Sequence, residues 1–315
     1  MLDSSKEKRV PMAIEQHEVH RIISGVSTVV KAWRTQHPLL SPLPKALYHY
    51  TSPAGLLGIL SQGKMRATHV TCLNDHSEFF HVVDVMKKRL NSKLPTADQC
   101  RPLLDEIARQ LAIMTPREMR GIFVICFADA ENSLTHWKGY GGGVGGIAMG
   151  FDRVELEHVA YSLPNSRGLA PVEYCPIRQK DLVDRVLDWS CRAWSERLSI
   201  YSDTDVSEWV FALLYPLTTI APLLKNEAFS DEKEWRIVIA DAPSEEIAVD
   251  TNFRGLTAYV LANLCNPITN RLPLREIWAG PGHFPDRELV AAEVAARKFG
   301  YKSLQYDKSE IAFRP

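Results

Sequence analysis

Residues 47–52 constrain the fold of this chain more than any other stretch. The sequence Leu-Tyr-His-Tyr-Thr has high strand propensity, and Ser52 can cap a helix that begins at Pro53. An apolar segment follows at 56–60, so the pattern predicts a strand, a sharp turn and a helix. His49 falls in the middle of that strand. Its imidazole can donate one hydrogen bond and accept another, which suits a ligand site, although a structural histidine is the commoner role for such a residue.

Length, composition and charge limit the class of protein. A chain of 315 residues with 45% hydrophobic content can bury a full core, as one large domain or one domain with a helical addition. The formal charge of −1 gives no overall basic field for nucleic acid, although a local basic groove remains compatible with it. The six cysteines are scattered without Cys-x-x-Cys spacing, which predicts reduced thiols and a cytoplasmic location.

Two segments bear on membrane targeting. The charged N-terminus is not followed by an apolar core, so we expect no signal peptide. Residues 209–224 are uncharged, but they are shorter than the roughly 20 residues that a membrane span needs, and they contain Pro216 and Pro222. We therefore expect a buried helix pair and no membrane association.

Hydrophobic periodicity predicts alternating helices and strands along the chain, and it shows no internal repeat. Asn74 and Asp75 can cap one of the helices, with Glu78 closing a capping box. The expected helices cover 10–36, two segments within 82–119, 178–201, 205–225, 255–264 and 286–299. The expected strands cover 64–73, 121–127, 147–151, a run beginning near 234, 276–279 and 303–306.

Metal and phosphate sites are weakly indicated. His17 and His20 lie three residues apart but have no visible third ligand, and the order of polar residues at 75–81 does not match His-Glu-x-x-His. The glycines of 141–146 lack Gly-Lys-Ser/Thr and lead into a strand, so a flexible turn beside a ligand is the better interpretation. We expect no metal cofactor.

Polar residues recur at expected strand edges, and this recurrence indicates a cleft. They are His49, then Trp137 with Tyr140, then Glu232 with Glu234. Each motif alone has a structural explanation, since the two glutamates also suit a solvated turn and the two aromatic residues could pack under the glycine turn. Their order along the chain favours a shared site.

The combination of motifs resembles a widespread bacterial family of unknown function. The shared blocks are Leu-Tyr-His-Tyr-Thr-Ser, Asn-Asp-x-x-Glu, Trp-x-x-Tyr before glycines, and Glu-x-Glu-Trp-Arg, spaced between about 47 and 281. This pattern in turn resembles the ADP-ribosyltransferase superfamily of the His-Tyr-Glu type. The middle motif departs from that superfamily, because Tyr140 precedes a glycine run instead of lying inside a strand-helix tyrosine pair.

The superfamily resemblance implies roles for individual residues. His49 would contact the ribose next to nicotinamide, Tyr140 with Trp137 would stack on nicotinamide, and Glu234 would be the catalytic carboxylate. Glu232 would orient the acceptor. Further candidates are Tyr50 and Thr51 beside His49 at the NAD site, and Asn74, Asp75 and Glu78 bracing the cleft from behind. Arg66 and Lys225 are candidates for contacting the pyrophosphate, and a place on an exposed face explains each of them equally well.

These roles agree with the chemistry of NAD cleavage. Breaking the bond between nicotinamide and ribose builds positive charge on the sugar, which a neighbouring carboxylate stabilises. Aromatic faces and a histidine hold the substrate so that attack comes from one side. NAD is then a substrate, and the reaction needs no metal.

The resemblance implies an α+β fold in which a split, ADP-ribosyltransferase-like core of two antiparallel sheets surrounds a cleft. Residues 1–44 would be an N-terminal helical extension, and 45–315 would be the main domain with a helical insertion at about 178–225. The expected activity is transfer of ADP-ribose to RNA, DNA or protein by a bacterial toxin or phage-defence effector, with a neutralising antitoxin as a further partner.

Two alternatives stay open. One is NAD hydrolysis, against which Glu232 argues mildly because a hydrolase needs no acceptor-orienting acid. The other is a non-catalytic nucleotide-binding or sensor module. The near-neutral charge weakens a nucleic-acid acceptor without excluding one.

Overall fold

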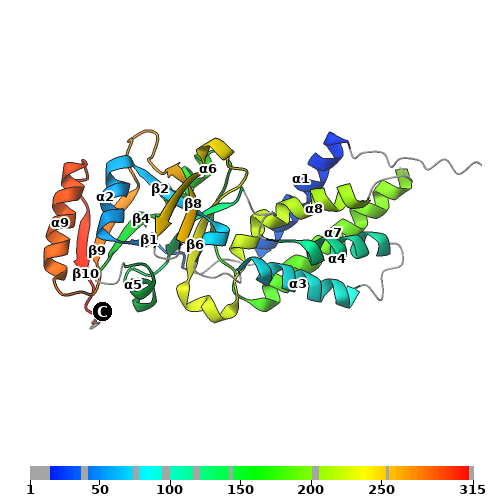
Figure 1. The fold of residues 1–315 in the computed structure, drawn as a ribbon, viewed down its shortest axis with the longest axis horizontal. Helices are drawn as coiled ribbons and strands as arrows, with labels where there is room; N and C mark the ends of the chain where they lie inside the picture. Colours follow the sequence, from blue (N-terminus) through cyan, green and yellow to red (C-terminus); the bar gives the residue numbers. More distant parts are fainter. Residues whose placement is uncertain are drawn as a thin grey trace, which may run out of the picture. The chain divides into compact units, whose positions relative to one another are not determined.

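The computed structural model describes residues 15–36, 42–73, 78–93, 100–115, 121–141, 145–200, 206–252 and 255–311 (Figure 1). Within them the chain mixes helices and strands, which agrees with the expected α+β class. It forms two compact units, one purely helical and one built on a sheet. Asn74 and Asp75 lie outside the described residues, and nothing is described of the Glu78 side chain.

The helical unit collects three separate parts of the chain, 1–38, 80–118 and 175–221. The division expected from the sequence assigns 80–118 to the main domain, whereas its contacts place it with the other helices. The described helices of this unit are α1 (Gln16–Gln36), α3 (Glu78–Lys93), α4 (Arg101–Ile113), α7 (Pro176–Ile200) and α8 (Val206–Ile220).

Apolar stripes hold the helical unit together. On α1 the buried positions Ile22, Val26, Val30 and Trp33 recur at the helical period, and the helix packs against α7 and α8. Trp209 of α8 is fully buried. Among the described residues, the segment Val206–Leu223 is long and apolar enough to cross a membrane, and 67% of it is buried inside the protein.

In its described residues the second unit is built on a ten-stranded sheet, in which β9 and β10 pair in parallel and the other strand pairs are antiparallel. The main path runs β10-β9-β4-β1-β3-β2-β8-β7, and β6 pairs with both β3 and β5. The strands are β1 (Ala46–Thr51), β2 (Lys64–His69), β3 (Phe123–Ala128), β4 (Ile147–Asp152), β5 (Ser166–Pro171), β6 (Glu234–Ile239), β7 (Ala248–Asn252), β8 (Gly255–Asn263), β9 (Leu274–Ala279) and β10 (Gln305–Lys308). The longer helices of this unit are α2 (Pro53–Gln62), α5 (Leu134–Tyr140), α6 (Arg153–Ser162) and α9 (Pro285–Lys298).

The sheet is divided at β3. One edge of β3 pairs with β6 along its whole length, while the other edge is shared by two strands that diverge. β2 pairs near the start of β3, and β1 pairs only through Tyr48 and Ala128. The two sheets expected from the sequence are therefore one hydrogen-bonded network with a gap between β1 and β2 along β3.

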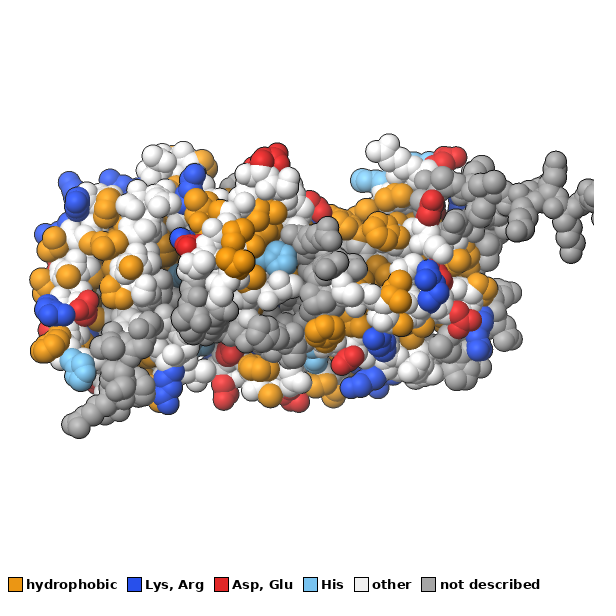
Figure 2. Space-filling view, viewed as in Figure 1, with side chains coloured by type: hydrophobic (Ala, Val, Ile, Leu, Met, Phe, Trp, Pro, Cys, Tyr) orange, Lys and Arg blue, Asp and Glu red, His pale blue; other side chains and the backbone are white. Residues whose placement is uncertain are grey.

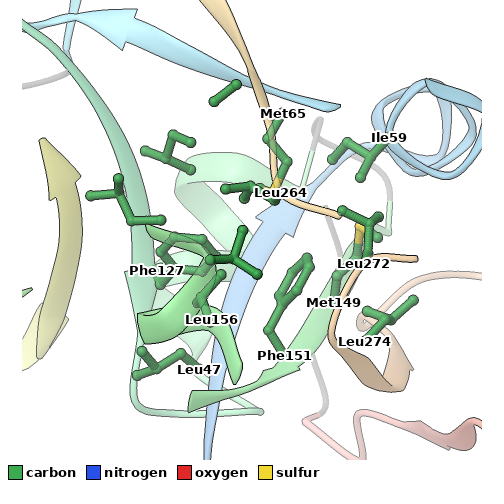
Figure 3. Close-up of a cluster of buried hydrophobic side chains, with 14 of the residues drawn as sticks. Leu47, Ile59, Met65, Phe127, Met149, Phe151, Leu156, Leu264, Leu272 and Leu274 are labelled. Atoms are coloured by element: carbon green, nitrogen blue, oxygen red, sulfur yellow. The ribbon is translucent and has the colours of Figure 1, made fainter. Parts of the chain in front are cut away.

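Most of the core lies on one face of this sheet. Leu47 and Met149 from neighbouring strands pack with Phe127 and Phe151, and helices α2, α6 and α9 supply further apolar side chains (Figure 3). Successive side chains of a strand point to opposite faces. Tyr48 and Tyr50 therefore reach a smaller cluster, on the opposite side to Leu47, with Trp137 of α5.

The strand, turn and helix predicted from residue 47 onward are confirmed. β1 leads into α2 through Ser52, whose hydroxyl accepts a hydrogen bond from the Gly55 amide at 3.1 Å, and Pro53 begins the helix. The apolar run near 121–127 forms β3, which pairs on both edges.

The helix expected at 255–264 is wrong. This segment is β8, which pairs with β2 on one edge and with β7 on the other. Val260 and Ala262 alternate into the core, and Thr257 and Tyr259 add strand propensity. The apolar residues of this segment can be interpreted as a helix, but their alternating burial and their pairing on both edges belong to a strand.

Candidate functional site

A pocket opens where β1 leaves β3, and its cavity volume is about 50 Å³. Its walls come from β1, β3, α5 and the start of β6, all within the sheet unit. The lining residues are Tyr48, His49, Tyr50, Cys126, Phe127, Ala128, His136, Tyr140, Glu232 and Glu234.

His49 uses the gap in the sheet. Because neither β1 nor β2 pairs with the middle of β3 on this edge, the Cys126 carbonyl is left to a side chain, and His49 Nδ1 lies 2.9 Å from it. A carbonyl only accepts, so Nδ1 carries the proton and the neutral ring has its lone pair on Nε2. Burial lowers the pKa of His49, and the bond to Cys126 only partly opposes this. The residue therefore presents a neutral acceptor nitrogen.

Helix α5 supplies an aromatic wall. The ring of His136 stacks with Tyr50 at 4.8 Å between centroids, and with Tyr140, one turn further along α5, at 6.1 Å. The Tyr50 hydroxyl donates to the Ala130 carbonyl at 2.6 Å and accepts from the Ser133 amide at 3.0 Å. The segment before α5 is thus fixed to β1.

A buried charge cluster forms the acidic side of the pocket. Glu234, 5% exposed, accepts from Arg236 at 2.7 Å and from Lys225 at 3.4 Å, both at Oε2. Lys225, 3% exposed, also donates to Glu232 at 2.6 Å. Arg236 donates to the Pro222 carbonyl at 2.6 Å as well. Two cations therefore bind two carboxylates in a region with little water.

The two carboxylates differ in pKa. Burial by itself would raise the pKa of Glu234, but Arg236 and Lys225 outweigh it and bring the pKa to about 2. For Glu232 burial prevails, and the pKa lies above its ordinary value despite the bond to Lys225. Glu234 is therefore a permanent anion near neutral pH, whereas Glu232 takes up a proton more readily.

The pocket brings together five of the residues that the sequence singled out. His49, Tyr50, Tyr140, Glu232 and Glu234 all line it, although they come from three separate parts of the chain. Lys225 contacts the two glutamates.

Three predicted residues lie elsewhere. Trp137 is buried in the small cluster beneath α5, where its indole N–H donates to Asn132 at 2.9 Å. Thr51 ends β1 outside the lining. Arg66 lies on β2, paired with Asp250 at 2.9 Å and placed over the Tyr259 ring. The register of β2 against β8 decides this position, and sequence alone does not supply it.

His136 and Arg236 are site residues that the sequence interpretation missed. The spacing of His136 and Tyr140, four residues apart on a helix, was the available signal for the first. Within the described part of the chain, no group of three or more His, Cys, Asp or Glu side chains is arranged to hold a metal ion.

The structure thus defines a mixed helix-and-sheet protein with a small pocket that combines aromatic rings, two histidines and two acids. Residues 136–237 match the model of a family described as a protein of unknown function (DUF2971). That segment contains His136, Tyr140, Glu232 and Glu234 but begins well after His49. No curated protein and no solved structure gives a significant match to the chain.

Proposed function

We propose that this pocket binds the nicotinamide riboside end of NAD and that the protein transfers ADP-ribose to a macromolecular acceptor. The observation that carries the proposal is the meeting of His49, Tyr140 and Glu234 in one pocket, from β1, α5 and β6. These are the residue types and the chain order that the His-Tyr-Glu resemblance implies. The gap between β1 and β2 along β3 also agrees with a split sheet of that superfamily.

The chemistry of the pocket suits this half of the substrate. Its cavity volume of about 50 Å³ lies below the roughly 300–1,000 Å³ of most ligand pockets, so the proposal requires lining side chains to move aside when nicotinamide riboside binds. Stacked aromatic rings favour a planar ring such as nicotinamide, and the lone pair of His49 Nε2 can accept from a ribose hydroxyl. Glu234 would stabilise the positive charge that develops on the ribose.

The charge cluster favours a second candidate, a non-catalytic nucleotide-binding module. Lys225 and Arg236 both bind Oε2 of Glu234 and offset its charge. A carboxylate compensated in this way stabilises a developing cation less than a free one does. The pocket would then hold a nucleotide without cleaving it.

Surface charge bears on the acceptor. On the face shown in Figure 2, lysine and arginine side chains of the described residues lie scattered among acidic ones. Polyanion binding uses gathered basic groups. This face therefore offers no reason to prefer nucleic acid over protein as the acceptor. The toxin or defence role, with its antitoxin partner, belongs to the same proposal.

The test is release of nicotinamide from labelled NAD, with a cell lysate separated into protein, RNA and DNA fractions. We expect label to enter one fraction with the native protein. We expect Glu234→Gln to lower the rate by about 10²–10³-fold, the range for loss of one electrostatic stabiliser. Glu227→Gln is the matched control, because Glu227 is an exposed acid of the same segment that does not line the pocket.

The outcomes separate the candidates. Free ADP-ribose with no labelled macromolecule would establish hydrolysis instead of transfer. Binding of NAD without release of nicotinamide would establish the binding module. If the protein neither binds NAD nor releases nicotinamide from it, the NAD assignment is refuted altogether.

A further inference from the structure

His136 is a titratable pocket residue that the proposed reaction leaves without a chemical role. It exposes only 6% of its surface and stacks with the rings of Tyr50 and Tyr140. A buried histidine usually has both nitrogens hydrogen-bonded or packed against apolar groups. His136 departs from this pattern.

Its Nδ1 is fixed by Ser133. The two atoms Nδ1 and Ser133 Oγ lie 2.9 Å apart. Ser133 stands at the N-cap of α5, where a serine hydroxyl normally binds a backbone amide of the first turn, yet it makes no such bond. The hydroxyl instead contacts the imidazole, so the chain forgoes a helix cap and orients this ring.

Its Nε2 is available to a ligand. This nitrogen has no hydrogen-bond partner among the described residues, although the ring lines the pocket. The groups facing the ring from other elements are Tyr50 on β1, Glu234 on β6 and Lys225 before it. Cys126 of β3 and Glu232 line the same pocket. Burial lowers the pKa of His136, with Glu234 opposing and Lys225 reinforcing, so the ring is neutral near pH 7.

We propose that His136 is the proton acceptor of the transfer step. This inference rests on the proposed function. The nucleophilic atom of the acceptor forms a bond to C1 of the ribose as the bond from C1 to nicotinamide breaks, and nicotinamide leaves as a neutral molecule with the electron pair of that bond. The proton released by the nucleophile passes to Nε2 of His136 while Nδ1–H donates to Ser133. Glu234 and His49 remain with the ribose.

The test compares His136→Gln with the native protein, following transfer to the labelled acceptor between pH 5 and 9. General-base catalysis contributes about 10²–10⁴-fold, so we expect at least about a 100-fold loss of kcat. The native rate should fall on the acid side of a pKa below the usual histidine value, and this acid limb should disappear in the variant. Added imidazole should partly restore His136→Ala. His158→Gln, an exposed histidine on α6, is the control.

Ser133→Ala provides an independent test should His136 variants fail to fold. It leaves the imidazole in place but removes its Nδ1 partner, and we expect a loss of transfer of about fivefold, the worth of one neutral hydrogen bond. Unchanged transfer in Ser133→Ala would count against the proposal.

The results distinguish two kinds of failure. Unchanged kcat and acid limb in His136→Gln, with a raised KM, would show that the residue is only a wall for nicotinamide and would overturn this inference alone. Absence of nicotinamide release from the native protein would overturn the proposed function and this inference with it.

Discussion

Substitution of Glu234 by Gln tests the buried charge cluster through its pH dependence. The pKa of Glu234 is lowered from the ordinary 4.5 to about 2, net of burial, by Arg236 and Lys225. At 1.36 kcal/mol per pH unit this difference corresponds to about 3 kcal/mol of folding free energy. Removing one partner of a buried ion pair costs about 3–5 kcal/mol, which is the same order.

Proton linkage determines whether this contribution to stability rises or falls with pH. A carboxyl whose pKa is lowered on folding contributes stability that is fully present above 4.5 and is lost as pH falls towards about 2. We therefore expect Glu234→Gln to be less stable than the native protein by about 3 kcal/mol at pH 7. The two proteins should converge as pH approaches 2.

The assay is hydrogen exchange of the β6 amides in increasing urea, measured at several pH values and corrected for intrinsic exchange. This readout reports the sheet unit separately from the helical unit. Glu227→Gln should follow the native curve throughout. The electrostatic reasoning is refuted if the free energies of unfolding of Glu234→Gln and the native protein differ by the same amount at pH 7 and at pH 3.

Four further substitutions test packing near the site and the surface placement of Arg66. Gly280→Ala places a Cβ 2.7 Å from the Trp137 ring and should cost about 1–3 kcal/mol by overpacking, whereas Gly139→Ala meets nothing within 4 Å and should leave the melting temperature equal or higher. Tyr50→Phe leaves the half-buried Ala130 carbonyl and Ser133 amide without their shared hydroxyl, and should lower stability by about 1 kcal/mol in thermal unfolding. Arg66→Ala removes an exposed ion pair with Asp250 and an exposed contact with the Tyr259 ring, each worth about 1 kcal/mol or less, so a large drop in melting temperature would contradict that placement.

Local sequence predicted those elements whose signals are local. The β1–α2 turn follows from Ser52 and Pro53, and the central position of β3 follows from its unbroken apolar run. β8 did not follow, because apolar residues at 255–264 fit either period until β2 and β7 pair with them. The pairing partner decides the conformation there, and that partner lies far away in the sequence.

The candidate site, too, has features that the sequence indicates and features that only the structure reveals. His49, Tyr140 and Glu234, which the motif order singled out, line one pocket. It could not show that Trp137 points into the core, because the turn of α5 decides which aromatic residue faces the pocket. His136 escaped notice because a histidine near a tryptophan and a tyrosine looks like ordinary packing. Its significance depends on the unused cap at Ser133, which only the structure reveals.

The discontinuous helical unit has a consequence for how the chain folds during synthesis. α1 is made before α7 and α8, against which it packs, and these two helices lie in the second half of the chain. Such contacts between distant segments are slow to form, and the surfaces that wait for them stay exposed. The buried stripe of α1, with Ile22, Val26 and Trp33, must therefore remain uncovered on the ribosome while β1 to β5 are produced. This helix is the segment of the nascent chain that we expect a chaperone to bind.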